Sequence, residues 1–251
     1  MNHRGHISAI LILCLLFGCN DRKMEQSEER SPTTRMVKFS AEIPDYYSDG
    51  CNAQVSSYPV PFEKVPKETP FLYLPEGAVN LAKGKRVKTR EGLTIIQGSL
   101  EMITDGDKQA TEGHFVVFDS DKVTTQWVQV DLGDICEIHG IWVWHYYGTG
   151  TIGEKLYEDV VVQISSDEDF GEQVTTVFNN DFDGSSGFGI GKDKPYWETR
   201  FGKAISVDGV KGRYVRVSGT GDCKSHLFGM IELEVYGHLI NKKNNAGEQA
   251  P

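Results

Sequence analysis

The sequence predicts an all-β protein, built as an antiparallel sandwich or a small barrel. From residue 93 onward, short runs rich in Val, Ile, Thr and aromatic residues recur, separated by Gly, Asp, Ser and Asn. No stretch of about twelve residues keeps a helical spacing of apolar side chains. The expected strands are LTIIQ (93–97), HFVVF (114–118), WVQVDL (127–132), IHGIWVWHYY (138–147), EDVVVQIS (158–165), VTTVF (174–178), RYVRVS (213–218) and MIELEVY (230–236).

Alternation within these runs predicts which side of each strand is buried. Successive side chains of a strand point to opposite faces of its sheet. The apolar side chains expected on buried faces are Val128, Val130, Leu132, Val215, Val217, Ile231, Leu233 and Val235. The charged side chains expected on solvent-facing sides are Arg216, Glu232 and Glu234. Opposite charges on neighbouring strands can then form cross-strand ion pairs.

The run IWVWHYY (141–147) departs from this alternation because both of its faces are apolar. That pattern predicts a central strand covered on both sides, with Trp142 and Val143 in the core. Polarity rises after Tyr146, so the strand is expected to emerge into a Gly/Thr-rich loop.

An ordered set of motifs carries a family resemblance. NLAKGKRV, ITDGD, WVQVDLG, EIHGIWVW, GRYVRVSG and IELEVYG follow one another, and together they span about residues 78 to 237. In this the chain resembles discoidin domains, also called coagulation-factor type C domains, and the family-32 carbohydrate-binding modules. The resemblance implies a galactose-binding-like jelly roll of two antiparallel sheets, with ligand-binding loops at one end and often a structural calcium. The insert 179–198 is longer than this pattern expects.

The amino-terminal residues predict an envelope lipoprotein. Arg4 precedes an apolar run that is too short to span a bilayer, and LFGC (16–19) resembles a bacterial lipobox. We therefore expect a signal peptide at 1–18 and lipidation of Cys19, the alternative being an ordinary cleaved signal with Cys19 unmodified. The expected organisation continues with a flexible tether (19–42), an extension (43–75), the sandwich (76–238) and a disordered tail (239–251).

The net charge limits the classes of binding partner that we expect, and the cysteine content limits the disulfides. The formal net charge is -10, and an acidic surface repels phosphate backbones, so no nucleic-acid partner is expected. Cys51, Cys136 and Cys223 remain beyond the tether, an odd number in an oxidising compartment. One disulfide among them is expected, for which Cys51 with Cys223 is one candidate pairing.

A calcium (Ca²⁺) site is expected in the loop ITDGDKQATEG (103–113). Asp105, Asp107 and Thr111, with Glu112 close by, offer several hard oxygen ligands. The family resemblance implies completion by a glutamate on the last strand, which is Glu232 here, with Glu234 as the alternative. The competing interpretation is a plain Asp-Gly turn, with Glu232 paired to Arg216.

The long insert holds a second acidic loop. Asn179, Asp181, Asp183 and Gly184 match the first half of an EF-hand-like loop, but Ile190 stands where the bidentate glutamate belongs. We therefore expect weak cation binding at most, and the simpler interpretation is an acidic surface loop.

Aromatic residues near the predicted loop end are candidates for sugar contacts. Sugar recognition needs a flat aromatic face together with hydrogen-bonding groups for the hydroxyls. The candidate ligand-binding residues are Trp144, His145, Tyr146, Tyr147, Tyr196, Trp197 and His226. For each aromatic taken singly, burial in the core is the competing interpretation.

These observations predict a non-catalytic recognition module, anchored to a bacterial envelope membrane, that binds carbohydrate or another cell-surface glycoconjugate. The alternative is a structural or assembly lipoprotein whose extension (43–75) meets a protein partner. A cell-wall glycan hydrolase is a third reading, although the sequence contains no nucleophile elbow, zinc motif or marked carboxylate pair.

Overall fold

The computed structural model describes residues 34–44, 59–111, 113–119, 125–146, 156–221 and 227–240. The predicted signal peptide, Cys19, Cys51 and Cys223 lie outside this part of the chain. Within the described residues, no helix combines the length and the apolar character that crossing a membrane requires.

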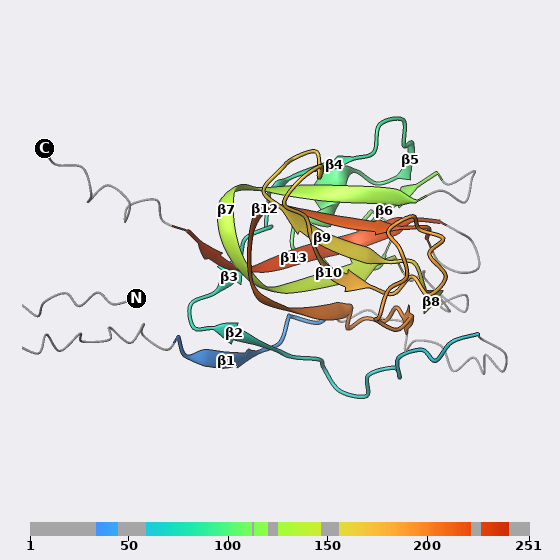
Figure 1. Cartoon of the computed structure of the whole chain (residues 1–251). Coiled ribbons are helices and arrows are strands. Elements are labelled where there is room, and N and C mark those ends of the chain that lie inside the picture. The colour runs from blue at the N-terminus through green and yellow to red at the C-terminus, as the bar shows by residue number, and fades with distance from the viewer. Residues whose placement is uncertain are drawn as a thin grey trace, which may run out of the picture. The chain divides into compact units, whose positions relative to one another are not determined.

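Strands make up nearly all of the regular structure (Figure 1). In chain order they are β1 (Met36–Phe39), β2 (Leu72–Pro75), β3 (Val79–Asn80), β4 (Arg86–Thr89), β5 (Ile95–Gln97), β6 (Val116–Phe118), β7 (Gln126–His145), β8 (Leu156–Tyr157), β9 (Val161–Ser165), β10 (Thr175–Asn179), β11 (Tyr196–Trp197), β12 (Lys203–Gly219) and β13 (Gly229–Leu239). A short 3-10 turn, Leu100–Ile103, lies between β5 and β6.

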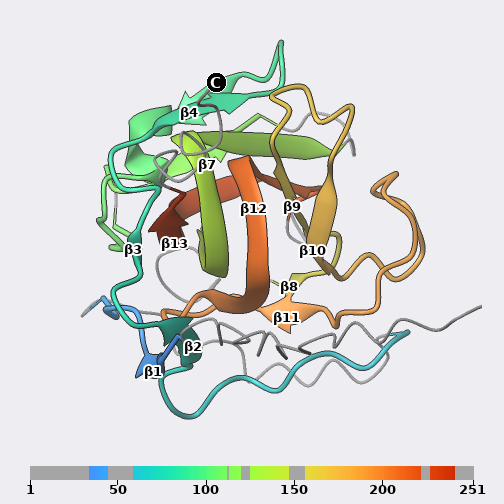
Figure 2. The same ribbon diagram turned by 60° about the vertical axis from the view of Figure 1, so that its left-hand side comes forward.

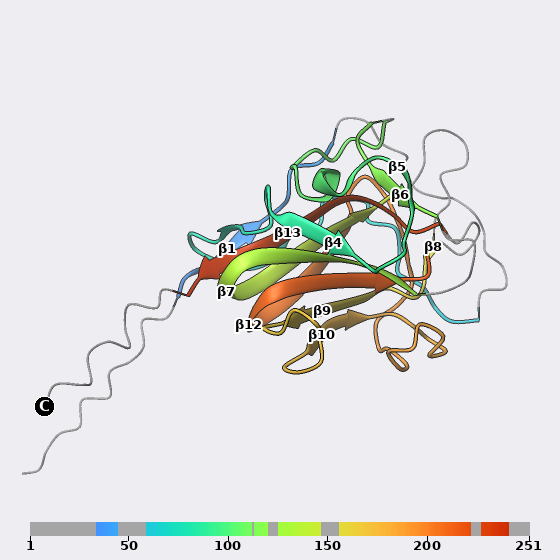
Figure 3. The same cartoon turned by 90° about the horizontal axis from the view of Figure 1, so that it is seen from above.

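The two longest strands, β7 and β12, pair with each other and belong to both layers of the sandwich. Their outer parts, Gln126–Asp131 and Tyr214–Gly219, lie in a layer ordered β10-β9-β12-β7-β4. The remaining, inner parts of the two strands follow Asp131 in β7 and precede Tyr214 in β12. They lie in a layer ordered β12-β7-β13-β6-β5, and β3 pairs with β13 in the same layer. The register of β12 on β7 shifts at two points, between Ser206 and Val210 and between Gly212 and Tyr214. Such irregularities bend strands, and Figure 3 shows both strands curving from one layer into the other.

Every strand pairing among the described residues is antiparallel. The predicted fold class, a two-sheet antiparallel jelly-roll sandwich with an amino-terminal extension, is therefore confirmed.

The main core fills the space between the two layers. It contains the predicted inward-facing residues Val128, Val130, Leu132, Val215, Val217, Leu233 and Val235. Cys136 is also buried there with a free thiol, so it forms no disulfide, and the suggested pair Cys51–Cys223 falls outside the described residues.

The last strand departs from the simple alternation. The register of β13 on β7 shifts between Met230 and Glu232, and Ile231 packs in a second apolar cluster instead of the main core. Glu232 and Glu234, expected at the solvent, are buried. The competing interpretation, in which Glu232 pairs with Arg216, is wrong on this point, because the Arg216 guanidinium donates to the Gln129 side chain.

The second cluster lies on the outer face of the β13 layer, beneath the amino-terminal extension. Trp142 and Trp144 are fully buried there, and Leu72 and Leu74 of β2 pack against them. Each indole also donates a hydrogen bond to a backbone carbonyl, from Trp142 to Phe201 at 2.7 Å and from Trp144 to Arg200 at 3.1 Å. The prediction that this strand is covered on both faces is confirmed.

The extension depends on a close approach that a glycine permits. A Cβ placed at Gly140 would lie 2.7 Å from Leu72 Cδ1 and 2.9 Å from Leu74 Cδ2. β1 pairs with β2, so Met36–Phe39 is part of the folded body, as Figure 2 shows. The predicted tether therefore ends several residues before residue 42.

Strand β2 supplies a matched test of this packing. Leu74 is 1% exposed and Tyr73 is 58% exposed. We predict that Leu74→Ala lowers the free energy of unfolding by about 2–4 kcal/mol, because it leaves a cavity against the tryptophans. Tyr73→Ala should change it by less than about 0.5 kcal/mol. If urea denaturation shows the same loss of unfolding free energy for Leu74→Ala as for Tyr73→Ala, the extension does not unfold cooperatively with the sandwich.

Candidate functional site

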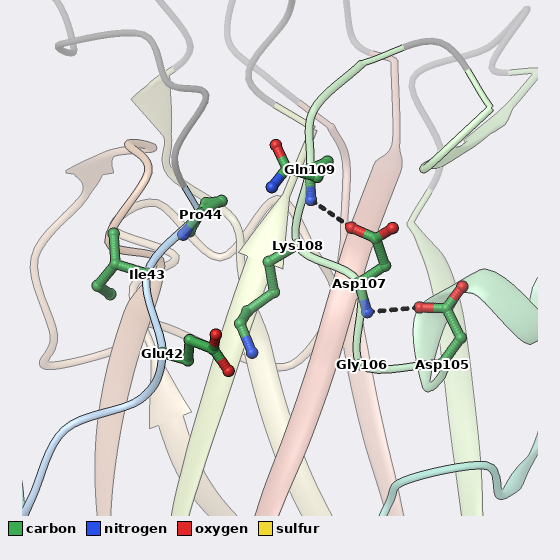
Figure 4. Close-up of a pocket in the computed structure, with 8 residues that line it drawn as sticks. All are labelled: Glu42, Ile43, Pro44, Asp105, Gly106, Asp107, Lys108 and Gln109. Atoms are coloured by element: carbon green, nitrogen blue, oxygen red, sulfur yellow. Dashed lines mark hydrogen bonds between the residues drawn. The ribbon is translucent and has the colours of Figure 1, made fainter.

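An open hollow of about 380 Å³ lies between the extension and the loop before β6. Figure 4 shows the segment 42–44 on one side and residues 105–109 on the other, with the side chains of Glu42 and Lys108 directed toward each other. The lining residues are Glu42, Ile43, Pro44, Asp105, Gly106, Asp107, Lys108 and Gln109. Polar groups predominate in this lining, and Ile43 and Pro44 are its apolar members.

Short-range hydrogen bonds hold the loop in shape. The backbone N–H of Asp107 donates to Asp105 Oδ1 at 2.7 Å, and that of Gln109 donates to Asp107 Oδ1 at 2.9 Å (Figure 4). Gly106 has a φ of 91°, which a residue without a Cβ adopts at no steric cost. Such Asp-led turns pre-order a loop before any ligand arrives.

Beneath the loop, Glu232 projects from β13 as a fully buried carboxyl. Its Oε2 accepts a hydrogen bond from the Gly106 N–H at 3.2 Å, while Oε1 has no partner among the described residues. Burial raises the pKa of Glu232 to about 9, and the nearby charges of Glu234 and Asp105 add to the effect. In the absence of a cation this carboxyl therefore carries a proton at neutral pH.

The residues predicted to bind calcium are only partly brought together. Glu232 accepts a hydrogen bond from Gly106, and Asp105 lies close enough for its charge to raise the pKa of Glu232. The unpartnered Oε1 of Glu232 fits a cation. Asp107 turns away, with its Oδ2 2.7 Å from His114 Nδ1. Thr111 is half-buried, and its carbonyl accepts from the His114 N–H.

Glu234, the alternative ligand, is already committed to other groups. It accepts from Lys108 Nζ at 2.8 Å and from the Tyr236 hydroxyl at 2.8 Å. The Lys108 ammonium also lies 5.2 Å from the centre of a Trp144 ring. The fit to calcium therefore rests on Glu232 and Asp105.

The predicted aromatic platform is not a surface in this structure. Trp144, His145, Tyr196 and Trp197 are all buried, so their ring faces are not available for stacking. Tyr146 is half-buried and stacks on Phe115, with ring centres 4.0 Å apart. Tyr147 and His226 lie outside the described residues. The physical reason is that the extension covers the tryptophans, while the region around β11 covers His145.

Instead of a platform, these residues form a buried polar cluster. The Glu198 carboxylate accepts the backbone N–H of His145 at 3.0 Å and lies 3.3 Å from its Nδ1. The Tyr196 hydroxyl lies 3.1 Å from the same nitrogen, and Tyr157 stacks on the imidazole. Burial raises the pKa of Tyr196 well above its usual value. Glu198 was not a candidate from the sequence, because its pairing with His145 spans 53 residues.

The described surface presents other aromatic side chains. Phe71 and Tyr73 of the extension are exposed and form an edge-to-face pair, with ring centres 5.6 Å apart. Lys38 of β1 lies over the Phe71 ring at 4.1 Å. Phe71 and Tyr73 alternate along the chain with the buried Leu72 and Leu74. This period-two alternation is the one sequence pattern that distinguishes the exposed aromatics from the buried leucines.

Comparison with known proteins gives structural likeness only. No protein-family model and no curated protein sequence matches the chain. Among solved structures, it is similar to a chitosan-binding module of a chitosanase/glucanase from Paenibacillus sp. IK-5, with 20% identity over 63% of this chain and 99% of that one, at a TM-score of 0.45. It is also similar to a fucose-binding module from Streptococcus pneumoniae, with 18% identity over 64% of this chain and 98% of that one, at a TM-score of 0.43. A family 89 glycoside hydrolase from Clostridium perfringens is 19% identical over 69% of this chain, which spans 15% of that enzyme's length, at a TM-score of 0.44.

The raised pKa of Glu232 predicts a pH-dependent stability. Between its usual pKa near 4.5 and its folded value of about 9, only the native state holds the proton, so this residue makes the free energy of unfolding fall as pH rises. The contribution is at most about 1.4 kcal/mol per pH unit. In chelator, Glu232→Gln should flatten the profile between pH 5 and 9 and stabilise the protein at the alkaline end. Parallel profiles for wild type and variant would contradict the assignment.

Proposed function

We propose that this protein is a non-catalytic carbohydrate-recognition module whose ligand binds in the hollow of Figure 4. The observation that carries the proposal is that hollow of about 380 Å³, open, pre-ordered and lined mainly by polar groups. Its volume is within the range of about 300–1,000 Å³ typical of small-molecule sites. The jelly roll and the order of the sequence motifs, both similar to those of discoidin-like binding domains, support the same function.

The lining suits polyhydroxylated ligands. Carboxylates of Glu42 and Asp105 accept hydrogen bonds from hydroxyl groups, and the carboxamide of Gln109 both donates and accepts. Ile43 and Pro44 offer an apolar surface to the C–H side of a sugar ring. Each contact is weak, so retention on a glycan-rich surface depends on many copies acting together.

Calcium has a supporting role in this proposal. Glu232 and Asp105 would hold the ion, with the remaining oxygen ligands supplied by the loop backbone or by water. Binding would tie the loop 105–109 to β13 and so reduce the entropy that the loop loses when a sugar binds.

A glycan array tests the proposal directly. We predict that the mature protein retains specific glycans and that Glu42→Gln weakens binding of the best one by about 10-fold, which corresponds to loss of a hydrogen bond of about 1.4 kcal/mol. The control is Glu91→Gln, since Glu91 is likewise exposed but lies outside the hollow. Chelator should lower the signal of the wild type.

Two results would contradict the proposal. Unchanged affinity in Glu42→Gln would place the ligand elsewhere on the domain. Release of reducing sugar from a polysaccharide by the pure protein would favour the glycan-hydrolase alternative.

We further propose that lipid on Cys19 holds the module at the bacterial envelope. The lipobox-like LFGC and the polar stretch after it support this anchor. Two or more acyl chains suffice for durable membrane attachment, because each buried CH₂ contributes about 0.8 kcal/mol.

Fractionation of cells checks the anchor. Cys19→Ser should move the protein from the membrane fraction to the soluble fraction, and mass spectrometry of the wild type should show a mass gain on the amino-terminal peptide. A wild-type protein that is found soluble, with an unmodified Cys19, would contradict the anchor while leaving the glycan proposal intact.

The assembly alternative also has an observation in its favour. β1 has only one strand partner among the described residues. Met36 and Tyr73 are exposed on this two-stranded sheet, and so is Phe71, which directly precedes β2. An exposed strand edge beside apolar side chains suits the addition of a partner strand. A protein that binds no glycan but loses a co-purifying partner in Tyr73→Ala would favour that function.

A further inference from the structure

A cluster of acidic side chains separate from the hollow lies where the link between β8 and β9 meets the loop after β10. Asp159 comes from the link, and Asp181 and Asp183 come from the loop, which leaves the sandwich on the side of β10 and β11 (Figure 2). Each residue offers a carboxylate oxygen, and these oxygens lie within 4.8 Å of one another. Among the described His, Cys, Asp and Glu residues, no other group of three or more comes together in this way.

The loop is held in this shape by its own polar groups. The Asp181 carboxylate accepts from the backbone N–H groups of Gly184 at 2.7 Å and Ser186 at 2.9 Å, and also from the Ser186 hydroxyl. Asn180 ties the loop to the link, since its Oδ1 accepts from the Val160 N–H at 2.7 Å and its Nδ2 donates to the Tyr157 carbonyl at 3.0 Å. The acidic side chains are therefore brought together by a built structure that spans two segments of the chain.

Asp159 supplies a second, independent observation. It is 7% exposed, and its Oδ2 accepts from the Thr220 hydroxyl at 2.6 Å. Its Oδ1 is buried and accepts no hydrogen bond from any donor among the described residues. The nearby Ser185 side chain lowers the pKa of Asp159 and so favours the charged carboxylate. An unpartnered buried carboxylate oxygen costs on the order of several kcal/mol, so a bound cation is the natural partner.

The electrostatic surroundings of Asp159 also agree with a bound cation. Burial raises the pKa of Asp159, and the charges of Asp181 and Asp183 raise it further. The neighbouring Glu158 has its pKa raised to about 7, by burial and then by Asp159 and Asp183. The groups that shift these two carboxyls include no lysine or arginine.

We propose that Asp159, Asp181 and Asp183 form a binding site for a hard divalent cation of the calcium class. Two oxygen ligands of one Ca²⁺ ion are at most about 4.8 Å apart, twice the Ca–O distance of about 2.4 Å. The carboxylate oxygens of this cluster lie within 4.8 Å of one another, so their separation permits contact with a single ion. Exposed Asp183 gives the ion a path from solvent, and water fills the remaining positions. The Ser186 hydroxyl, which donates to Asp181, turns away when the ion binds.

The ion has a defined structural consequence. It joins the β8–β9 link to the long insert, two segments that are also connected through the hydrogen bonds of Asn180. The Ile190 that stands in place of the last EF-hand ligand does not prevent this, because Asp159, from a different segment, completes the site. This site is independent of the proposed glycan site and of Glu232.

Calorimetric titration of the mature protein with Ca²⁺, and with Mg²⁺ for comparison, tests the site. We expect Asp183→Asn to weaken one Ca²⁺-binding event by at least 10-fold and Asp159→Asn,Asp183→Asn to remove it, while Glu232→Gln leaves it in place. Asp169→Asn is the matched control, because Asp169 is an exposed aspartate outside the cluster. Ca²⁺ should also raise the melting temperature of Glu232→Gln, and this rise should vanish when Asp183→Asn is added.

Asp183 is exposed, so its substitution keeps the test valid even if variants of the buried Asp159 fold poorly. Identical Ca²⁺ stoichiometry and affinity in the wild type and in Asp183→Asn would overturn the proposal. So would the absence of any Ca²⁺ binding by Glu232→Gln at millimolar concentrations. Neither result bears on glycan binding, which the array measures separately.

Discussion

The continuous pairing of β7 with β12 is the constraint on which the rest of the structure depends. Because both strands run through both layers, the sandwich has no independent sheets that slide past each other, and the bulges in β12 set where the layers diverge. β13, β9 and β4 then add to edges that this pair defines. The inner half of β7 becomes a central strand, and its outward face requires a cover.

The amino-terminal extension is that cover, and it changes the chemistry of the residues beneath it. Apolar burial by Leu72, Leu74 and Phe39 against the tryptophans stabilises the cover. Glu232 and Glu234 stand opposite Trp144 and Trp142 in the register of β13 on β7, and both are buried, as is Lys108. A buried ion pair such as Lys108–Glu234 adds little net stability but is costly to break on one side, so it favours a single arrangement of the loop 105–109. The hollow between the extension and this loop therefore results from the way in which the extension covers the sheet.

Much of the fold was predictable because short-range patterns report it. Alternation identified Val128, Val130, Val215 and Val217 as core, and the doubly apolar run identified Trp142 and Val143 as central. The site was less predictable. An aromatic side chain such as Trp144 or Trp197 has the same local pattern whether it lines a cleft or packs against another segment. Only the position of the extension and of the region around β11 decides between these outcomes, and both are set by contacts between residues far apart in the chain.

The sequence by itself determined the all-β antiparallel class, the buried faces of most strands and the position of an acidic loop at residues 103–113, because strand periodicity and turn chemistry act over a few residues. Tertiary structure alone decided that Glu232 is buried, that Asp107 contacts His114, and that Asp159 lies close to Asp181 and Asp183. These outcomes depend on which segments lie side by side. The free energy that selects them comes from apolar burial over whole surfaces, which no local pattern records.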